Sequence, residues 1–276
     1  MSEAVVAPPA PQSPPSTAIR ARPSGFFSDV ASVANRALRL LPRDLETILP
    51  ALIVPLFFFV VTIGAIQNLA GDAVPGFDYK AFQLPVAIMT AVTGMSRANS
   101  LVVDIVNGYF DRLLMTPINR YALLLGLMVA DMVLFLVLAT PVLVLGFAIG
   151  VSFGATGVLG VLVFMLFGAF WGLAYTGFPY AIALRTGNPG AVNSSFLLFF
   201  PFMFLTTAWV SREVMTDWLA AITWFNPMTY ALEAMRSLFL GWDGWALGRG
   251  IFAVSIVGLL AQTLAFRSLN GRVRRG

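Results

Sequence analysis

Long apolar runs separated by short polar segments make up most of this chain. Six of these runs are predicted to cross a lipid bilayer as helices, at about residues 48–69, 82–106, 121–149, 158–184, 192–209 and 251–266. A helix of about 22 residues, with a rise of about 1.5 Å per residue, reaches about 33 Å, which is enough to cross the hydrocarbon layer. The pattern therefore predicts an all-α integral membrane protein with six transmembrane helices.

An amphipathic helix is predicted before the first span, over residues 25–42. Apolar residues recur between positions 26 and 41 at the i, i+3, i+4, i+7 spacing of one helix face, while Asp29, Arg36 and Arg39 occupy the other face. Helices of this kind lie flat in the membrane interface with their Arg side chains in the headgroup layer. The alternative is a soluble helix that packs on a partner.

The distribution of basic residues predicts the orientation of the spans. An even number of spans places both ends of the chain on one side, and that side receives 13 of the 17 Lys and Arg residues. Because cytoplasmic loops are rich in Lys and Arg, both termini are predicted to be cytoplasmic, with the chain in the plasma membrane. The polar segment 107–120 is then cytoplasmic, and the polar segment 210–248 is extracellular.

The two ends of the chain are predicted to be tails. Residues 1–24 are rich in Pro, Ala and Ser and contain few large apolar residues, so we expect a disordered cytoplasmic tail. This stretch lacks the apolar core of a signal peptide. Residues 271–276 contain three Arg residues and are expected to form a basic cytoplasmic tail. The membrane domain then covers residues 25–270.

Composition excludes several classes of function. Of the 276 residues, 58% are hydrophobic and 11% are charged, whereas a globular domain has about 25% charged residues. The chain contains neither Cys nor His, which rules out disulfides, thiolate sites, His-ligated metals and Ser-His catalysis. The net charge of +4 comes almost wholly from Arg, and in a membrane protein it reflects orientation and not nucleic-acid binding.

The cytoplasmic segment between the second and third spans combines aromatic and charged residues. Tyr109, Phe110 and Leu113 are apolar anchors beside Asp111 and Arg112. A short amphipathic helix that exposes aromatic and charged side chains to water suits a protein interface. The alternative is a solvated turn whose apolar side chains only dip into lipid, and these residues alone do not separate the two.

The segment W-F-N-P-M-T-Y-A-L-E-A-M-R-S-L-F-L-G, residues 224–241, is polar although it lies between two apolar runs. Asn226 is predicted to cap a helix that has Pro227 at its first position. Glu233 and Arg236, three residues apart, share a helix face and can neutralise one another. A plain extracellular loop is the alternative.

Two charged residues interrupt the predicted spans. Arg97 lies in the second span and Asp131 in the third, at similar depths from the cytoplasmic side. Isolated charges in hydrocarbon are unfavourable and usually face the helix bundle and pair. We therefore expect Arg97 and Asp131 to form an intramembrane charge pair. Alternatively, Asp131 is a counter-ion for a cationic drug or a proton carrier.

Two motifs resemble those of a known family. The run D-R-L-L-M-T-P-I-N-R-Y-A-L-L-L-G-L-M-V-A-D, residues 111–131, resembles the (E/D)RL…TP…R…G segment of the type-2 ABC exporter permeases. The run F-N-P-M-T-Y-A-L-E-A-M-R-S-L-F-L-G, residues 225–241, resembles the NP(L/M)TY…(E/D)..R signature of the same family. The six-span order and the outer insertion agree over residues 26–270. Within the family, the chain is similar to the daunorubicin/doxorubicin-resistance permeases of actinobacteria, although position 111 is more often Glu.

The resemblance implies a membrane-spanning permease subunit of an ATP-driven exporter, which is not itself an enzyme. Two copies of a separate ABC ATP-binding subunit would hold ATP and Mg, since this chain has no G-x-x-x-x-G-K-[ST] loop and its only Lys, Lys80, is followed by Ala81. A second permease, identical or closely related, would complete the pathway. The exported substrate would be a bulky amphipathic drug, antibiotic or lipid-like molecule, which aromatic and Met-rich spans suit.

The resemblance also implies roles for the two polar segments. Residues 107–120 would contain a cytoplasmic coupling helix that docks in a groove of the ATPase, with the N-terminal helix as the second contact. The residues assigned to coupling are Tyr109, Phe110, Asp111, Arg112, Leu113, Pro117 and Arg120. Residues 210–248 would form an outer re-entrant helical hairpin before the last span. The residues assigned to this gate are Asn226, Pro227, Tyr230, Glu233 and Arg236.

Two other functions stay open from the sequence. A proton-coupled secondary multidrug transporter would use Asp131 as its proton site, and it predicts inverted repeats that the hydropathy pattern does not show. A membrane enzyme is disfavoured because the chain has no His or Cys and its acidic residues are scattered.

Overall fold

The structure, a computed structural model, describes residues 25–43, 45–73, 76–116 and 118–274. The predicted N-terminal tail, residues 1–24, lies outside the described residues. The described secondary structure is entirely helical, as predicted. Its α-helices are α1 Phe26–Leu40, α2 Leu45–Ala73, α3 Tyr79–Thr93, α4 Ala98–Val106, α5 Tyr109–Leu114, α6 Arg120–Ala148, α7 Gly157–Thr186, α8 Pro189–Phe204, α9 Asp217–Thr223, α10 Pro227–Leu240 and α11 Gly244–Val273.

Five stretches of helix in the described chain are long and apolar enough to cross a membrane. They are Ile48–Asp72, Tyr79–Val106, Arg120–Ala148, Gly157–Thr186 and Gly244–Val273. The limits of α6 agree with the sequence prediction to within one residue. In contrast, α11 begins before residue 251 and continues through Val273, so part of the predicted tail 271–276 is helical. The sequence therefore predicts a multi-pass membrane protein correctly.

The predicted fifth span, residues 192–209, corresponds to the shorter helix α8. This helix has 16 residues and ends at Phe204, which at about 1.5 Å per residue is about 24 Å. It begins at Pro189 because the side chain of Asn188 accepts hydrogen bonds from the N–H groups of Gly190 and Ala191. The predicted limits are corrected accordingly.

The predicted second span, residues 82–106, is not one helix. Its first part, α3, ends at Thr93, and its second part, α4, begins at Ala98. Gly94 has a weak preference for helix, and the hydroxyl of Ser96 accepts a hydrogen bond of 3.1 Å from the N–H of Ala98. A break of this length hardly changes the hydropathy of the segment, which is why the apolar pattern does not reveal it.

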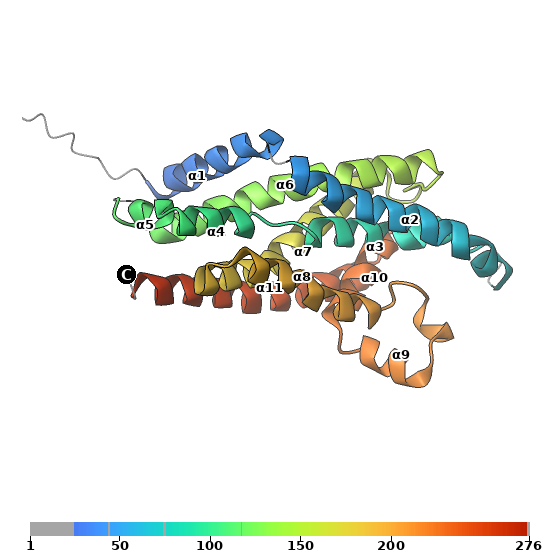
Figure 1. The fold of residues 1–276 in the computed structure, drawn as a ribbon. Coiled ribbons are helices and arrows are strands. Elements are labelled where there is room, and N and C mark those ends of the chain that lie inside the picture. Colours follow the sequence, from blue (N-terminus) through green and yellow to red (C-terminus); the bar gives the residue numbers. More distant parts are fainter. Residues whose placement is uncertain (1–24, 44, 74–75, 117, 275–276) are drawn as a thin grey trace, which may run out of the picture.

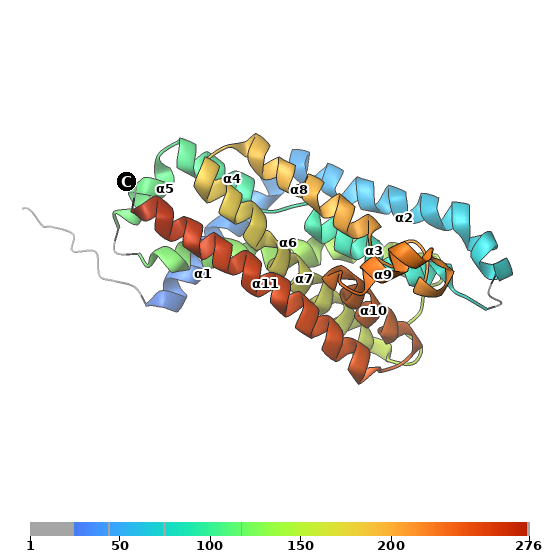
Figure 2. The same ribbon diagram turned by 90° about the horizontal axis from the view of Figure 1, so that it is seen from below.

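The helices form an elongated bundle with α7 at the centre, and α11 lies along α7 at the edge of the bundle (Figure 1, Figure 2). The close approach of these two helices depends on Gly177, because a Cβ atom at this position would lie 2.3 Å from the carbonyl carbon of Ala261. One end of the bundle carries α1, α5 and the C-terminal end of α11, and the other end carries α9 (Figure 1). The two polar segments of the sequence therefore lie at opposite ends of one bundle.

Helix α1 packs along α6 through small residues. Ala34 and Ala37 are buried, and a Cβ atom on Gly126 of α6 would lie 2.6 Å from the Cβ of Val33. Asp29, which the sequence placed on the polar face, is also buried, and its Oδ2 accepts a hydrogen bond of 3.3 Å from the N–H of Asn119. The amphipathic pattern therefore predicted both the helix and the apolar face that packs on the protein, but it placed Asp29 on the opposite, polar face.

Candidate functional site

The first candidate region is α5, at the end of the bundle that also holds the C-terminal end of α11. Gly108 precedes the helix with a φ of 67°, a left-handed conformation that side chains rarely adopt. The helix has 6 residues and ends at Leu114, so it is shorter than the predicted coupling helix, for which the sequence suggested residues 107–120. Gly108 allows the sharp turn from α4 into α5.

Phe110 of α5 points into the protein, where it is only 4% exposed and packs in the core with the N-terminal part of α6. The sequence predicts an aromatic ring exposed for a partner at this position, and the structure corrects this for Phe110. Burial of the ring fixes α5 to the bundle, since a buried Phe contributes about 2 kcal/mol through its apolar surface. Asp111 and Arg112, next in the chain, are exposed.

The charged side chains of α5 have partners within the chain. The Oδ2 atom of Asp111 lies 3.6 Å from Nη2 of Arg272 in α11. The guanidinium of Arg112 donates to the carbonyl oxygens of Gly108 and Asn107, both at 3.3 Å. Arg112 thus closes its own turn, whereas Asp111 links α5 to the last turn of α11.

An Arg–carboxylate pair holds α1 against α4 beside this region. Nη1 and Nη2 of Arg36 donate to the two carboxylate oxygens of Asp104 at 3.1 and 3.0 Å. The same guanidinium lies 4.2 Å from the ring centroid of Tyr109. Partial burial lowers the pKa of Arg36, but the hydrogen bond and charge of Asp104 outweigh it and raise the pKa above its usual value. The pair therefore joins α1, α4 and the start of α5.

The other residues assigned to coupling lie in or after the turn that follows α5. Leu113 is partly buried, and Pro117 lies outside the described residues. Arg120 is exposed at the start of α6, with its guanidinium 5.6 Å from the ring centroid of Tyr121. The hydroxyl of Tyr121 bonds Oδ1 of Asn270 at 3.2 Å, so this turn is also linked to α11.

The break between α3 and α4 is held by Asp131 of α6. Its Oδ1 accepts a hydrogen bond of 2.8 Å from the backbone N–H of Arg97, and its Oδ2 accepts one of 2.7 Å from the hydroxyl of Tyr180. Ser96 Oγ lies 3.5 Å from the same Oδ2. The guanidinium of Arg97 donates to the carbonyl oxygen of Ala37 in α1 at 2.8 Å. The structure brings Arg97 and Asp131 together through a hydrogen bond from the backbone N–H of Arg97 to the carboxylate of Asp131.

The outer candidate region contains two helices, α9 and α10, that meet at Asn226 and Pro227. Asn226 caps α10 as predicted, since its Oδ1 accepts a hydrogen bond from the N–H of Met228. Pro227 is the first residue of the helix. The amide Nδ2 of Asn226 also donates to the carbonyl oxygens of Phe202 and Leu205, at 2.7 and 3.0 Å. Asn226 therefore satisfies the start of α10 and the end of α8 at once.

Glu233 and Arg236 lie on one helix as predicted, but within the described chain the ion pairs of Glu233 and the hydrogen bonds of Arg236 go to other residues. Glu233 pairs with Nη2 of Arg212, at 2.9 Å, and with Nη2 of Arg249, at 3.7 Å. The guanidinium of Arg236 lies 3.4 Å from the ring centroid of Phe82, and its Nε donates to the carbonyl oxygen of the same residue at 3.0 Å. The two side chains thus tie α10 to different neighbours.

Aromatic rings surround the same outer region. The hydroxyl of Tyr230 donates to the carbonyl oxygen of Trp224 at 2.6 Å, which closes the turn between α9 and α10. The guanidinium of Arg212 lies 4.0 Å from the ring centroid of Trp224. Trp224 and Phe225 are nevertheless 53% and 89% exposed. The turn between the two helices therefore presents aromatic surface outward.

The two regions that carry the motifs lie within the part of the chain that matches a known family. The family model described as "ABC-2 type transporter" matches residues 29–240, which include both α5 and α10. The chain belongs to this family. The match confirms the family suggested by the D-R-L…T-P and N-P-M-T-Y motifs.

Individual relatives of this ABC-2 chain carry names from drug resistance. It is 34% identical over 184 residues to the daunorubicin resistance ABC transporter permease protein DrrB1 of Streptomyces coeruleorubidus, an alignment that spans 62% of each chain and so less than two thirds of the relative. It is 24% identical over 242 residues to the probable doxorubicin resistance ABC transporter permease protein DrrC of Mycobacterium tuberculosis, covering 86% of this chain and 83% of that one. It is 28% identical over 172 residues to the probable multidrug ABC transporter permease YbhR of Escherichia coli, covering 60% and 45%.

Several residues that hold the two regions of this ABC-2 chain in place were not predicted. The sequence places Arg212 and Arg249 in the predicted outer segments and Arg272 in the predicted basic tail, without indicating a partner for any of them. Tyr180, the donor to Asp131, lies in an apolar span where no local pattern marks it. The sequence signal available was that each charged or hydroxyl-bearing residue in an apolar environment needs a partner, but it does not say which one.

Proposed function

We propose that this chain is the membrane-spanning permease subunit of an ATP-driven ABC exporter and has no catalytic activity of its own. The observation that carries the proposal is the location of the two family motifs at opposite ends of one bundle (Figure 1). An exporter driven from the cytoplasm needs this arrangement, because ATP acts at one end and the substrate leaves at the other. Two copies of an ABC ATP-binding subunit would bind ATP and Mg.

The coupling surface would be the exposed side of α5 together with α1. Asp111, Arg112 and Met115 are exposed there, while the buried ring of Phe110 and the Asp111–Arg272 contact hold the helix to the bundle. Because the buried ring of Phe110 anchors α5 to the bundle on one side, α5 can transmit a displacement imposed by a partner without unfolding. The ATPase would therefore contact the charged side of α5 and not its aromatic side.

The six spans of the permease would be α2, α3–α4, α6, α7, α8 and α11, with both termini cytoplasmic in the plasma membrane. Helices α9 and α10 would form the outer re-entrant hairpin, with Asn226, Pro227, Tyr230, Glu233 and Arg236 at the gate. Irregular backbone at membrane depth needs partners for its polar groups. The hydrogen bonds from Asn226 to the last carbonyls of α8 meet that need and support the proposal.

The substrate pathway would run along α2, α3–α4 and α8. A cavity of about 480 Å³ lies between these helices, bordered by Pro50, Thr90, Asn99, Asn193 and Phe199 among others. Large apolar side chains of α2, such as Phe57 and Phe58, are 60% and 51% exposed. A second permease, identical or homologous, would cover this side. Membrane lipid would cover the remaining apolar faces of the bundle.

The substrate would be a bulky amphipathic molecule: a drug, an antibiotic or a lipid-like product. The names of the relatives, which refer to daunorubicin, doxorubicin and multidrug transport, support this class. The contacts of Asp131 argue against the alternative of a proton-coupled transporter. Its side chain is fully buried and already accepts hydrogen bonds from Arg97 and Tyr180, which indicates a structural role.

The test is transport by purified protein in liposomes, with and without a candidate ABC ATP-binding subunit, using doxorubicin as a fluorescent probe. We expect doxorubicin movement that requires both subunits and ATP, and that continues when an uncoupler collapses the proton gradient. Movement that stops with the uncoupler but ignores removal of ATP would contradict the proposal and favour a secondary transporter. Substrate turnover by the chain alone would indicate an enzyme.

A further inference from the structure

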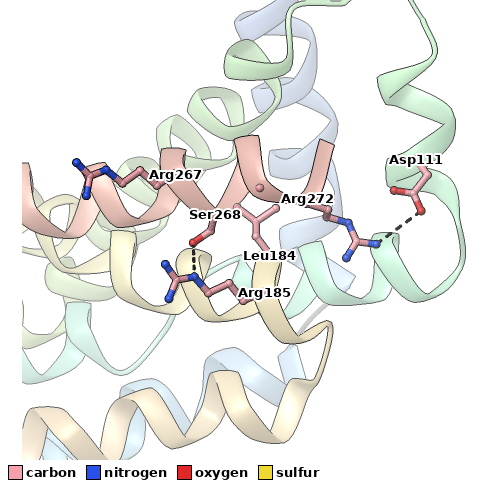
Figure 3. A pocket seen from close by; sticks show the side chains of 7 residues that line it. Asp111, Leu184, Arg185, Arg267, Ser268 and Arg272 are labelled. Atoms are coloured by element: carbon pink, nitrogen blue, oxygen red, sulfur yellow. Dashed lines mark hydrogen bonds and ion pairs between the residues drawn. The ribbon is translucent and has the colours of Figure 1, made fainter. Parts of the chain in front are cut away.

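A basic cleft lies between α5, α7 and α11 at the end of the bundle that holds the C-terminal end of α11 (Figure 3). Its volume is about 560 Å³. The residues that border it are Asp111, Leu184, Arg185, Arg267, Ser268, Gly271 and Arg272. Three arginines and one aspartate thus border the cleft, which carries an excess of positive charge; Arg272 lies next to Asp111, whereas the guanidinium of Arg267 lies on the other side of the cleft (Figure 3).

The hydrogen-bonding capacity of these arginines is largely unused within the described residues. Arg185 donates through Nε to Ser268 Oγ at 2.9 Å, which orients its guanidinium along the cleft. Arg272 reaches Asp111 through Nη2, while its Nε is buried and has no hydrogen-bond partner in the described chain. Arg267 is exposed, and no described carboxylate lies within ion-pair distance of it. Arg gains most when its planar fork meets an acceptor with several oxygens.

The cleft lies at the level where two apolar helices become basic. In α7, Arg185 is the first charged residue after the helix begins at Gly157. In α11, Arg267 is the first charged residue after Arg249, and residues 250–266 between them are uncharged. The boundary between apolar and basic residues on a transmembrane helix coincides with the headgroup layer of the bilayer. The guanidinium groups of the cleft are therefore at the depth of lipid phosphates.

We propose that this cleft binds the phosphate group of an anionic phospholipid. Arg185, Arg267 and Arg272 would donate to the phosphate oxygens, and the acyl chains would follow the apolar surfaces of α7 and α11 into the bilayer. The inference rests on the chain spanning a membrane and not on which substrate it transports. Basic pockets between transmembrane helices are a recurring way to hold anionic headgroups.

Asp111 makes this site sensitive to the state of α5. Its carboxylate shares Arg272 with the bound phosphate, and two negative groups on one guanidinium repel each other. A phosphate in the cleft would therefore weaken the contact between α5 and α11, and loss of that contact would favour the phosphate. Lipid binding and the position of α5 are linked through this one arginine.

The experiment is native mass spectrometry of the purified full-length chain in detergent, titrated with phosphatidylglycerol, with phosphatidylcholine or with inorganic phosphate. Arg267→Gln should weaken phosphatidylglycerol binding about tenfold, since a hydrogen bond to a charged group is lost. Arg39→Gln removes the same charge from an exposed position of α1 that does not border the cleft, and it serves as the matched control, with binding unchanged. Asp111→Asn should strengthen phosphatidylglycerol binding, because it removes the competing carboxylate.

The titrations distinguish the sources of the phosphate. Competition by inorganic phosphate at millimolar concentration, with no preference for phosphatidylglycerol over phosphatidylcholine, would retain the anion site but overturn its assignment to lipid. Equal effects of Arg267→Gln and Arg39→Gln would overturn the site altogether. If Arg267→Gln weakens binding of the ATPase and leaves lipid binding unchanged, the cleft is a protein contact and the proposal fails.

Discussion

Asp131 accepts a hydrogen bond of 2.8 Å from the backbone N–H of Arg97, so a carboxylate in one span holds the broken backbone of another. The N–H has no helical partner at this break, because Arg97 is the N-cap of α4. In a fully buried site the carboxylate also needs its donors, and Tyr180 supplies a second one at 2.7 Å. The contact explains how a helix can stop and restart within an apolar region.

Removing this carboxylate should destabilise the protein strongly. Asp131→Ala leaves the N–H of Arg97 and the hydroxyl of Tyr180 without an acceptor, and we expect a loss of about 3 kcal/mol and a fall in Tm of about 10 °C. Tyr180→Phe removes one donor only and should lower Tm by about half as much. Thermal unfolding in detergent measures both. Equal Tm values for wild type and Asp131→Ala would contradict this role.

Glu233 should stabilise the outer region through its two arginines. Glu233→Gln removes the charge that offsets Arg212 and Arg249, and we expect a loss of about 2 kcal/mol, because all three side chains are partly buried. A double-mutant cycle with Arg212→Gln should show a coupling energy above about 0.5 kcal/mol. Glu213→Gln, an exposed neighbour, is the control and should change stability by less than about 0.5 kcal/mol. Additive effects of the two substitutions would show that the pair does not matter.

Charge reversal on α5 should interrupt coupling without unfolding the protein. Arg112 is exposed, and the substitution Arg112→Glu loses only hydrogen bonds within the same turn. Membrane insertion and Tm should therefore stay close to wild type. At the proposed ATPase contact the reversed charge should reduce ATP-dependent doxorubicin transport at least tenfold, since like charges at an interface cost about 2 kcal/mol or more. Arg274→Glu, exposed at the same end, is the control. Normal transport by Arg112→Glu would remove α5 from the coupling surface.

The approach of α7 and α11 predicts opposite outcomes for two glycines. Gly177→Ala places a methyl group against the backbone of Ala261 and should destabilise the protein by about 1–3 kcal/mol. Gly64→Ala, in α2, meets no atom within 4 Å and should leave Tm unchanged or raise it, because Ala favours helix over Gly by about 0.5–1 kcal/mol. The two variants can be compared by thermal unfolding in the same detergent. A Tm for Gly177→Ala at or above that of wild type would show that the helices are not tightly packed there.

The elements of this fold that depend on local chemistry were predictable from the sequence. The length of the apolar runs predicts the long spans, since a single segment in lipid can form all of its backbone hydrogen bonds within itself only as a helix. Asn226 and Pro227 predict the start of α10, because capping involves only neighbouring residues. The family motifs around α5 and α10 were likewise readable from consecutive positions, and the family match agrees with them.

The pairing of charges was decided only by the tertiary structure. Glu233 and Arg236 satisfied the helix-spacing rule, yet Glu233 pairs with arginines 21 and 16 residues away in sequence, and Arg236 lies on Phe82 from another helix. Local spacing states which residues can meet on one helix, whereas the bundle offers each buried charge several partners from other helices. The same holds for Asp29 on α1 and for the break between α3 and α4. By itself, the sequence determined that these residues need partners, because lipid and protein interiors penalise unpaired polar groups, and the packing of α6, α7, α10 and α11 determined which partners they have.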